Sequence, residues 1–327
     1  MFRLSDRNKM RLAAVAVFLS PLLLYLPSLG NGYVGWDDGI ILEDVSIRSL
    51  SPENVLSFFV PRSGGTVTWQ PMRSLAFAAV YAISGFNPAG YIVLNILLYS
   101  LSVLLCFLVV HRLMLLWPER FTRRQAGQTA LISAAIFAFH PLHVEAVSWL
   151  QGGKFSLMTV FCLGSCLAWL RFRQNGRIAT LAAALGLYLC GLASQPAAVA
   201  LPLVLLGGEM LLPATGVSKG KRIAATGVFF LPMMAVAFQV VFLSTVTHTS
   251  SAGAPLSARI LMLPLLWSEY LLKFFLPVNL CCRYPLNIPE SAPWLRGLTA
   301  AGVLAVATWT GLRASGRLAR PAGFGLF

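Results

Sequence analysis

Hydrophobic runs of about 20 residues recur along this chain and constrain its fold more than any other feature. A helix of about that length crosses the hydrocarbon core of a bilayer. The runs are continuous, whereas the strands of a membrane barrel alternate apolar and polar residues. Only 11% of the residues are charged, against about 25% in soluble domains, and the mean hydropathy is +0.74. The sequence therefore predicts an all-α polytopic membrane protein and excludes an ordinary soluble domain.

The predicted spans leave two long segments outside the cytoplasm. Eight spans are predicted, at residues 12–29, 90–116, 128–147, 155–172, 178–194, 196–213, 223–244 and 294–311. The first outer loop, residues 30–89, is predicted to hold amphipathic helices at 52–59 and from 70 to about 84. A second outer segment covers residues 245–292. Residues 1–327 together are predicted to form one membrane domain.

Residues 260–278 leave the topology with two alternatives. The segment is amphipathic, because Arg259, Glu269 and Lys273 interrupt its apolar residues. An interfacial or re-entrant helix on the outer face is favoured. The alternative is a full span, which reverses the orientation of the last predicted span. The chain also ends on an apolar hexapeptide after a basic cluster, which resembles the start of a further span and suggests a truncated chain.

Basic residues gather beside the ends of the predicted spans. The net charge is +14, and 17 of the 25 Lys and Arg residues fall in five such clusters. This is the positive-inside pattern that marks cytoplasmic ends, so the charge is interpreted as a topology signal and no nucleic-acid partner is expected. The N-terminus is predicted to be cytoplasmic, with the first span as a retained signal anchor. A bacterial inner membrane is the expected location.

An acidic cluster follows the first span. Four of the 11 acidic residues fall between positions 37 and 44. A carboxylate costs about 2.5–3.5 kcal/mol at the centre of a bilayer, so these groups must lie at its edge or in a wet cavity. Asp37 and Asp38, next to Trp36, are the catalytic candidates, because a carboxylate there can act as a general base towards a hydroxyl. The alternatives are a helix cap or a solvated turn, and which aspartate acts is open.

A second polar group lies at the outer end of the third predicted span. It contains His140, His143 and Glu145. A metal site requires a third convergent ligand and commonly an i, i+4 pair, so no metal is predicted, although a divalent cation is left open. Binding of a phosphate or a sugar hydroxyl is favoured. The alternative is that these residues only cap the span.

Several cations are predicted to lie outside the cytoplasm. Those interpreted as substrate contacts are Arg73, Lys154 and Arg283, and the aromatic residues Trp36 and Tyr284 beside the charged groups are interpreted in the same way. A phosphate-bearing lipid carrier needs such donors, because its leaving phosphate gains charge in the transition state. The alternative is that these side chains extend to the interface and contact lipid headgroups.

Five segments, in this order, carry a resemblance to a known family. They are Asn31–Asp38 (NGYVGWDD), Trp69–Leu75 (WQPMRSL), Phe86–Asn95 (FNPAGYIVLN), Phe139–Val147 (FHPLHVEAV), and Leu276–Leu280 (LPVNL) with the following Tyr284-Pro285. They resemble the motifs of GT-C membrane glycosyltransferases of the TMTC-like, O-mannosyltransferase type, which have tetratricopeptide-linked relatives in bacteria. The set covers nearly the whole chain. The chain departs from the family pattern at Gly153-Lys154-Phe155, where an aspartate is missing, and at Ser194-Gln195, where a lysine is usual.

The resemblance implies an inverting transfer of a sugar, often mannose, from a polyprenyl-phosphate carrier to a protein or glycan hydroxyl on the outer face. It implies that Asp37 or Asp38 is the acceptor-activating base and that His140, His143 and Glu145 line the site. Membrane lipids, the lipid-linked donor and the acceptor are the expected partners, and no cofactor is expected. The competing hypotheses are a transporter or flippase for a lipid-linked substrate, and an inactive truncated subunit.

Overall fold

A computed structural model describes residues 5–60, 69–247, 256–281 and Gly302, and all regular structure within these residues is helical. The all-α prediction is therefore confirmed. The chain divides into two compact units, Met1–Val240 and Val241–Phe327, each of which is described by itself. The prediction of one domain over residues 1–327 stays a prediction.

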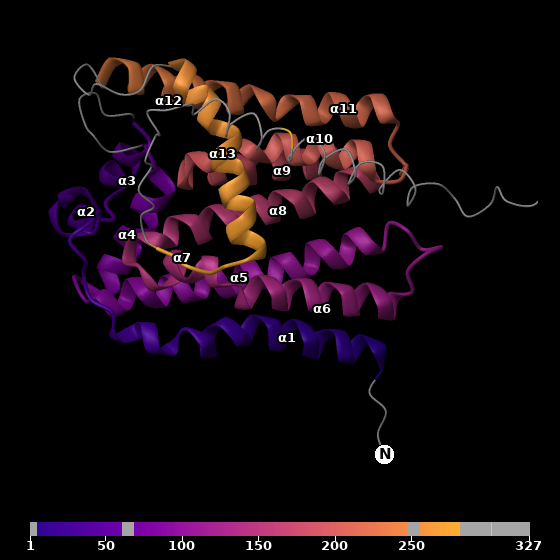
Figure 1. Cartoon of the computed structure of the whole chain (residues 1–327), viewed down its shortest axis with the longest axis horizontal. Coiled ribbons are helices and arrows are strands. Elements are labelled where there is room, and N and C mark those ends of the chain that lie inside the picture. The colour runs from indigo at the N-terminus through magenta and orange to yellow at the C-terminus, as the bar shows by residue number, and fades with distance from the viewer. Residues whose placement is uncertain (1–4, 61–68, 248–255, 282–301, 303–327) are drawn as a thin grey trace, which may run out of the picture. The chain divides into compact units, whose positions relative to one another are not determined.

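The first unit is a bundle of long helices with α5 in its middle (Figure 1). Its main helices are α1 (Asp6–Leu24), α5 (Pro88–Met114), α6 (Arg123–Phe139), α8 (Gly153–Asn175), α9 (Ile178–Ser194), α10 (Leu201–Leu211) and α11 (Lys219–Val228). Helix α5 packs against α1, α6 and α8. Helix α6 contributes the fully buried Ala130, Ala134 and Ala138 to the core. Residues four apart share one face of a helix, so these small side chains form a stripe that allows close packing.

Several of these helices are long and apolar enough to cross a membrane. Four described segments meet this test, namely Asn8–Gly30, Pro88–Met114, Leu150–Asn175 and Lys219–Gln239. Helix α6 and the bent segment Pro141–Ser148 make a fifth if they form one broken span. The described residues at 178–194 and 196–211 form shorter apolar helices. These findings support an integral multi-pass membrane protein. The count of eight spans stays a prediction, because 294–311 lies outside the described residues apart from Gly302.

The segment predicted to be the first outer loop is helical where the sequence predicts it. Helices α3 (Pro52–Phe58) and α4 (Pro71–Ser84) match the two predicted segments, and α2 (Gly39–Glu43) and the 3-10 turn η2 (Val45–Arg48) precede them. Helix α3 begins because the Ser51 hydroxyl accepts a hydrogen bond from the Asn54 backbone N–H, at 3.3 Å, with Pro52 at the first helical position. Helix α4 ends at Gly85, whose φ of +56° is a conformation that glycine adopts readily.

The second unit contains α13 (Leu256–Phe275) with Pro264 inside it. A helix is thus present where the sequence predicts one over 260–278. Whether it lies at the interface or spans the membrane stays a prediction. Helix α12 (Phe230–Thr247) extends from the first unit into the second.

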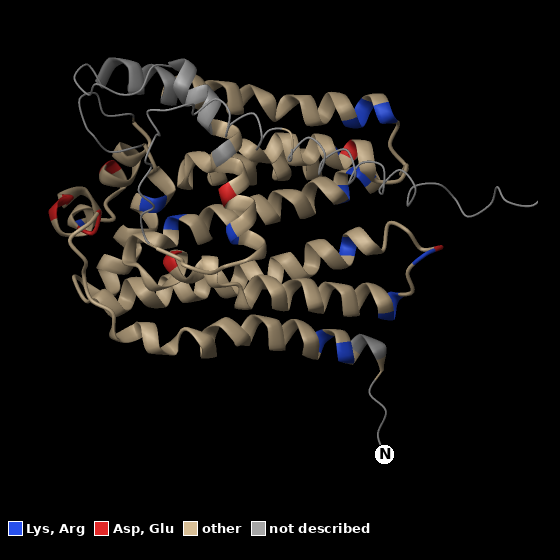
Figure 2. Cartoon of the chain, viewed as in Figure 1, with Lys and Arg blue, Asp and Glu red and all other residues tan. Residues whose placement is uncertain are grey.

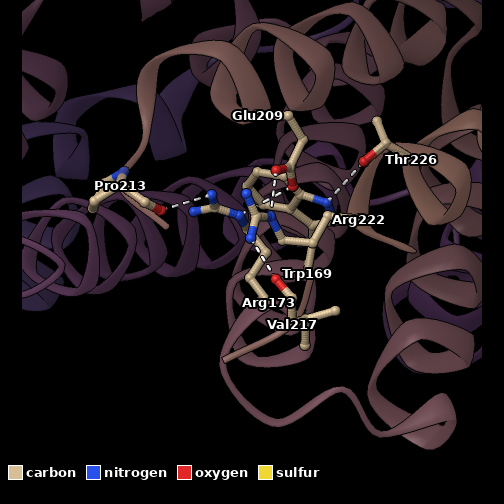
Figure 3. A network of polar contacts seen from close by, with 7 residues as sticks. All are labelled: Trp169, Arg173, Glu209, Pro213, Val217, Arg222 and Thr226. Atoms are coloured by element: carbon tan, nitrogen blue, oxygen red, sulfur yellow. Dashed lines mark hydrogen bonds and ion pairs between the residues drawn. The ribbon is translucent and has the colours of Figure 1, made fainter. Parts of the chain in front are cut away.

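Basic residues gather at one end of the first unit (Figure 2), where α1, α6 and α11 begin and α5 and α8 end. Not all of them reach solvent. Arg173 and Arg222 are buried, and both bind the buried carboxylate of Glu209 through their Nε atoms, at 3.0 and 2.8 Å (Figure 3). Their terminal nitrogens donate to the carbonyls of Pro213 and Val217 in the connection between α10 and α11. Two of the clustered cations therefore form an internal network as well as contributing to the charge asymmetry.

Candidate functional site

Three segments that are distant in the sequence meet at the opposite end of the first unit. Figure 1 shows α2, α4 and α7 (Val144–Ser148) together at that end. The turn before α2 carries the two catalytic candidates, the first turn of α4 carries Arg73, and the start of α8 carries Lys154. The turn between α7 and α8 contains η4 (Leu150–Gly152). It contacts the turn before α2 through a hydrogen bond from Gln151 to the Asp37 carbonyl, and it continues directly into α8. The site is therefore assembled by the fold of the bundle and not by one local motif.

Asp37 presents the more accessible carboxylate of the pair. Its side chain is 46% exposed, and its Oδ2 lies 3.8 Å from Nζ of Lys154. Its backbone carbonyl accepts a hydrogen bond from Nε2 of the buried Gln151, at 3.2 Å. The backbone of Asp37 is thus held from one side, while its carboxylate faces a cation and the exterior.

Asp38 is 1% exposed and points inward. Its Oδ2 accepts a hydrogen bond from the Val34 backbone N–H at 2.8 Å, and its Oδ1 has no hydrogen-bond partner among the described residues. Burial raises the pKa of Asp38 above its ordinary value. The N–H groups of Val34, Trp149 and Gln151 oppose this rise, although the last two lie outside hydrogen-bond geometry, and the charge of Asp37 adds to it. Asp38 therefore anchors the turn that presents Asp37.

The raised pKa of Asp38 predicts a pH-dependent effect on stability. Folding favours the neutral carboxyl of Asp38. Its contribution to the stability of the fold is therefore full below the unfolded-state pKa of about 3.8 and is lost as the pH rises through the folded-state pKa. Asparagine does not titrate and keeps an oxygen for the Val34 N–H. Asp38→Asn is therefore expected to gain stability relative to the unchanged chain as the pH rises over that window. Melting temperatures in detergent measure this, and a difference that does not vary with pH contradicts it.

Two buried cations face the turn that carries Asp37 and Asp38, here called the acidic turn. Arg73 is 4% exposed and Lys154 is 9% exposed. The Nε atom of Arg73 is buried and makes no hydrogen bond within the described part of the chain. Burial lowers the pKa of Arg73, and the charges of Asp44 and Asp37 oppose this. The ammonium of Lys154 also lies 5.3 Å from the centroid of the Trp149 ring. Two desolvated positive groups beside an accessible carboxylate suit an anionic ligand better than a neutral one.

Three glutamines complete the site, and the sequence patterns did not single out any of them as a contact. Gln70 donates to Oε1 of Gln195, which joins the start of α4 to the end of α9. The Oε1 atoms of Gln70 and Gln151 are buried and have no hydrogen-bond partner among the described residues. The signals that were available are the positions of Gln70 and Gln195 directly before prolines that begin helices. Burial of these amides followed only from the tertiary structure.

The histidines predicted to contact substrate are engaged within the chain. Nδ1 of His140 accepts a hydrogen bond from the Leu142 N–H, which caps the 3-10 turn η3 (Pro141–His143). Nδ1 of His143 lies 2.9 Å from both the Tyr99 hydroxyl and the Phe137 carbonyl oxygen. These contacts agree with the capping alternative. Substrate binding by the two histidines stays a prediction.

The remaining predicted contacts divide into exposed and undescribed residues. Trp36 is 55% exposed on the acidic turn, and Glu145 is exposed on α7. Arg283 and Tyr284 lie outside the described residues. Within the described ranges, no three His, Cys, Asp or Glu side chains lie close enough together to hold a metal ion.

Comparison with known proteins gives a consistent family of relatives. The chain is 33% identical over 159 residues to the protein O-mannosyl-transferase Tmtc1 of Drosophila melanogaster, which covers 47% of this chain and 17% of the relative. It is 27% identical over 272 residues to Tmtc2 of the same organism, covering 78% of this chain and 27% of the relative. It is 33% identical over 115 residues to human TMTC4, covering 34% and 16% respectively.

The matches are partial in both directions. The chain thus spans about a quarter or less of the length of these three relatives. No family model matches the chain. No solved structure matches it either. The curated relatives are all named as protein O-mannosyl-transferases, so the predicted resemblance to the TMTC-like GT-C membrane glycosyltransferases is confirmed.

Proposed function

We propose that this chain transfers a sugar, mannose or a similar hexose, from a polyprenyl-phosphate carrier to a hydroxyl of a protein or glycan. The relatives support a glycosyltransferase, since they are named protein O-mannosyl-transferases. The observation that carries the proposal is the convergence of Asp37 with the buried cations Arg73 and Lys154. Transfer takes place on the extracytoplasmic face, and the basic clusters at the opposite end of the first unit support that orientation (Figure 2).

Asp37 is the base in this proposal. Its carboxylate takes the proton of the acceptor hydroxyl while the hydroxyl oxygen attacks the anomeric carbon. The bond from that carbon to the phosphate oxygen breaks, and its electron pair leaves with the phosphate. One such displacement inverts the configuration at the anomeric carbon. Asp37 is assigned this role and Asp38 is not, because a base must reach its substrate and Asp38 is almost fully buried.

Arg73 and Lys154 hold the phosphate of the carrier. The leaving phosphate gains negative charge as the bond breaks, so cations fixed near it stabilise the transition state more than the ground state. Both side chains are desolvated, which strengthens their interaction with an anion. The carrier lipid and the surrounding membrane lipids supply the apolar environment. The acceptor approaches from the exposed side of Asp37.

Lys154→Met tests the proposed phosphate contact. Loss of one fixed donor to a developing charge costs about 10²–10³-fold in kcat, and a loss of that order is expected for transfer from polyprenyl-phosphate mannose by the purified chain. Lys154→Arg is expected to retain part of the activity, because it keeps the charge. The matched control is Arg177→Met, which removes an exposed cation at the connection between α8 and α9.

The same assay separates the competing hypotheses. Lipid-linked sugar that crosses vesicles without a covalent sugar product identifies a transporter or flippase and contradicts the enzyme proposal. Complete inactivity of a folded, unchanged chain with every polyprenyl-phosphate hexose and acceptor supplied supports the inactive-subunit hypothesis. Equal transfer by Lys154→Met and Arg177→Met contradicts the assignment of Lys154.

A further inference from the structure

Asn95 makes an unusual set of contacts for a residue inside a long apolar helix. It lies in the second turn of α5 and is fully buried. Its Nδ2 donates to three backbone carbonyls, those of Val147 at 3.3 Å, Trp149 at 2.7 Å and Leu150 at 3.3 Å. An amide NH₂ group has two hydrogens, so at least one of them is shared between acceptors. One side chain therefore binds three of the four backbone carbonyls from Val147 to Leu150, where α7 ends and η4 begins.

The backbone turn from Val147 to Leu150 that Asn95 holds, here called the 147–150 turn, leads directly into the candidate site. Gln151 follows it and donates to the Asp37 carbonyl. Trp149, within the turn, faces Asp38 and packs against Lys154. Lys154 lies in the first turn of α8, close to the Asp37 carboxylate. The 147–150 turn therefore sets the positions of Trp149, Gln151 and Lys154, which contact or face the two aspartates.

The segment is built so that it can approach Asn95 closely. A Cβ atom at Gly153 would overlap Oδ1 of Asn95, and a Cβ atom at Gly152 would overlap the backbone of Glu145 and Ala146. Glycine is therefore required at both positions for steric reasons, although neither has a positive φ. Close packing and hydrogen bonding act together on the same turn.

We propose that Asn95 is a positioning residue that fixes the 147–150 turn, and through it the groups that orient Asp37 and Asp38. Asn95 itself touches no substrate. The expected effect on sugar transfer rests on the proposed function. Leucine at this position has a similar volume but no donor, so all three carbonyls lose the bond from Asn95. The turn then keeps the bond from the Gly152 N–H to the Trp149 carbonyl and the bond from Asn31 to the Ser148 carbonyl, and it is expected to be more mobile. The expected consequences are faster backbone exchange in the turn, a higher pKa of Asp38 and slower sugar transfer.

The test uses two variants that disturb the turn from opposite sides. Asn95→Leu removes the donors, and Gly153→Ala pushes the turn away while Asn95 is retained. Ser165→Ala is the matched control, because it removes another buried side-chain bond to a carbonyl, that of Ala184 at 2.8 Å between α8 and α9. The full chain is purified in detergent, and its elution as a single species verifies folding.

Hydrogen exchange gives the first readout. Both test variants are expected to exchange faster over residues 144–153, while Ser165→Ala does not. Infrared spectroscopy gives the second readout, from the carboxyl band of protonated Asp38, assigned by its loss in Asp38→Asn. Loss of the facing N–H groups of Trp149 and Gln151 raises the pKa of Asp38, so the band is expected to persist to higher pH. Among the residues that the structure describes, the charged or titratable groups that act on this carboxyl are Tyr33 and Asp37.

Sugar transfer gives the third readout. It is expected to fall on the order of 10²-fold in both test variants, mainly in kcat, as a small misplacement of catalytic groups does. Unchanged exchange at 144–153 in both variants overturns the proposal. Faster exchange with an unchanged Asp38 band and unchanged transfer also overturns it. If the unchanged chain shows no transfer, the proposed function fails alone, and the exchange and infrared results still decide the role of Asn95.

Discussion

Asp37→Asn is expected to lower the rate of sugar transfer by about 10²–10⁴-fold, the usual contribution of a positioned general base. Asparagine keeps the shape of the side chain and cannot accept a proton at neutral pH. The carboxylate is 46% exposed, so its loss is expected to leave folding nearly unchanged. Transfer kinetics at saturating donor measure the effect, and the melting temperature verifies the fold.

The matched control for Asp37→Asn is Glu53→Gln, which neutralises an exposed carboxylate on α3, in the same connection between α1 and α4. It is expected to transfer sugar at the rate of the unchanged chain. Asp38→Asn distinguishes the two aspartates, because it alters the buried anchor of the turn and leaves Asp37 in place. Full activity of Asp37→Asn, combined with a loss of 10²-fold or more in Asp38→Asn, would assign the base to Asp38.

Glu209→Ala is expected to produce a large loss of stability. Removing the carboxylate leaves Arg173 and Arg222 buried with uncompensated charge, and breaking such a buried pair costs about 3–5 kcal/mol. Thermal unfolding in detergent, followed by loss of the single elution species, measures the change. Arg173 lies near the end of α8 and Lys154 near its start, so the network is far from the candidate site, and the effect is expected on stability and not directly on catalysis.

A triple variant separates charge from packing in this network. Replacing all three groups by apolar residues of similar size, with Arg173→Met, Glu209→Leu and Arg222→Met, removes every buried charge at once. Such replacements are commonly neutral or stabilising. The triple variant is therefore expected to melt well above Glu209→Ala. If Glu209→Ala melts at the temperature of the unchanged chain, the two ion pairs contribute nothing measurable.

The helices of this chain could be predicted from the sequence because their signals are local. Apolar runs, the proline at the start of α4 and the glycine at its end mark helices within a few residues of where the structure has them. The count of membrane spans is less predictable. Helices α9 and α10 are apolar but short, and the sequence does not show how the backbone breaks near Gln195 and Pro196.

The candidate site is only partly predictable from the sequence, because it depends on contacts between distant segments and not on local signals. Asp37 and Asp38 were singled out because carboxylates are costly in a membrane protein, and Lys154 and Arg73 because a phosphate needs cations. Their convergence depends on contacts between segments more than 30 residues apart, which local patterns do not encode. Amides such as Asn95 carry no charge, so their burial and contacts become visible only when the helices are packed.

Helix α8 connects the candidate site to the arginine–glutamate network. Lys154 lies in its first turn and Arg173 near its end, and their separation of 19 residues corresponds to about 28 Å of helix at 1.5 Å per residue. This length is close to the roughly 30 Å thickness of the hydrocarbon core of a bilayer. Arg173 is held by its buried ion pair with Glu209, and Lys154 lies 3.8 Å from the Asp37 carboxylate, so a charged contact fixes each end of this stretch of α8. A bilayer of another thickness is then accommodated by tilt of α8 or by local thickening or thinning of the surrounding lipid, and α8 sets the thickness at which neither is needed.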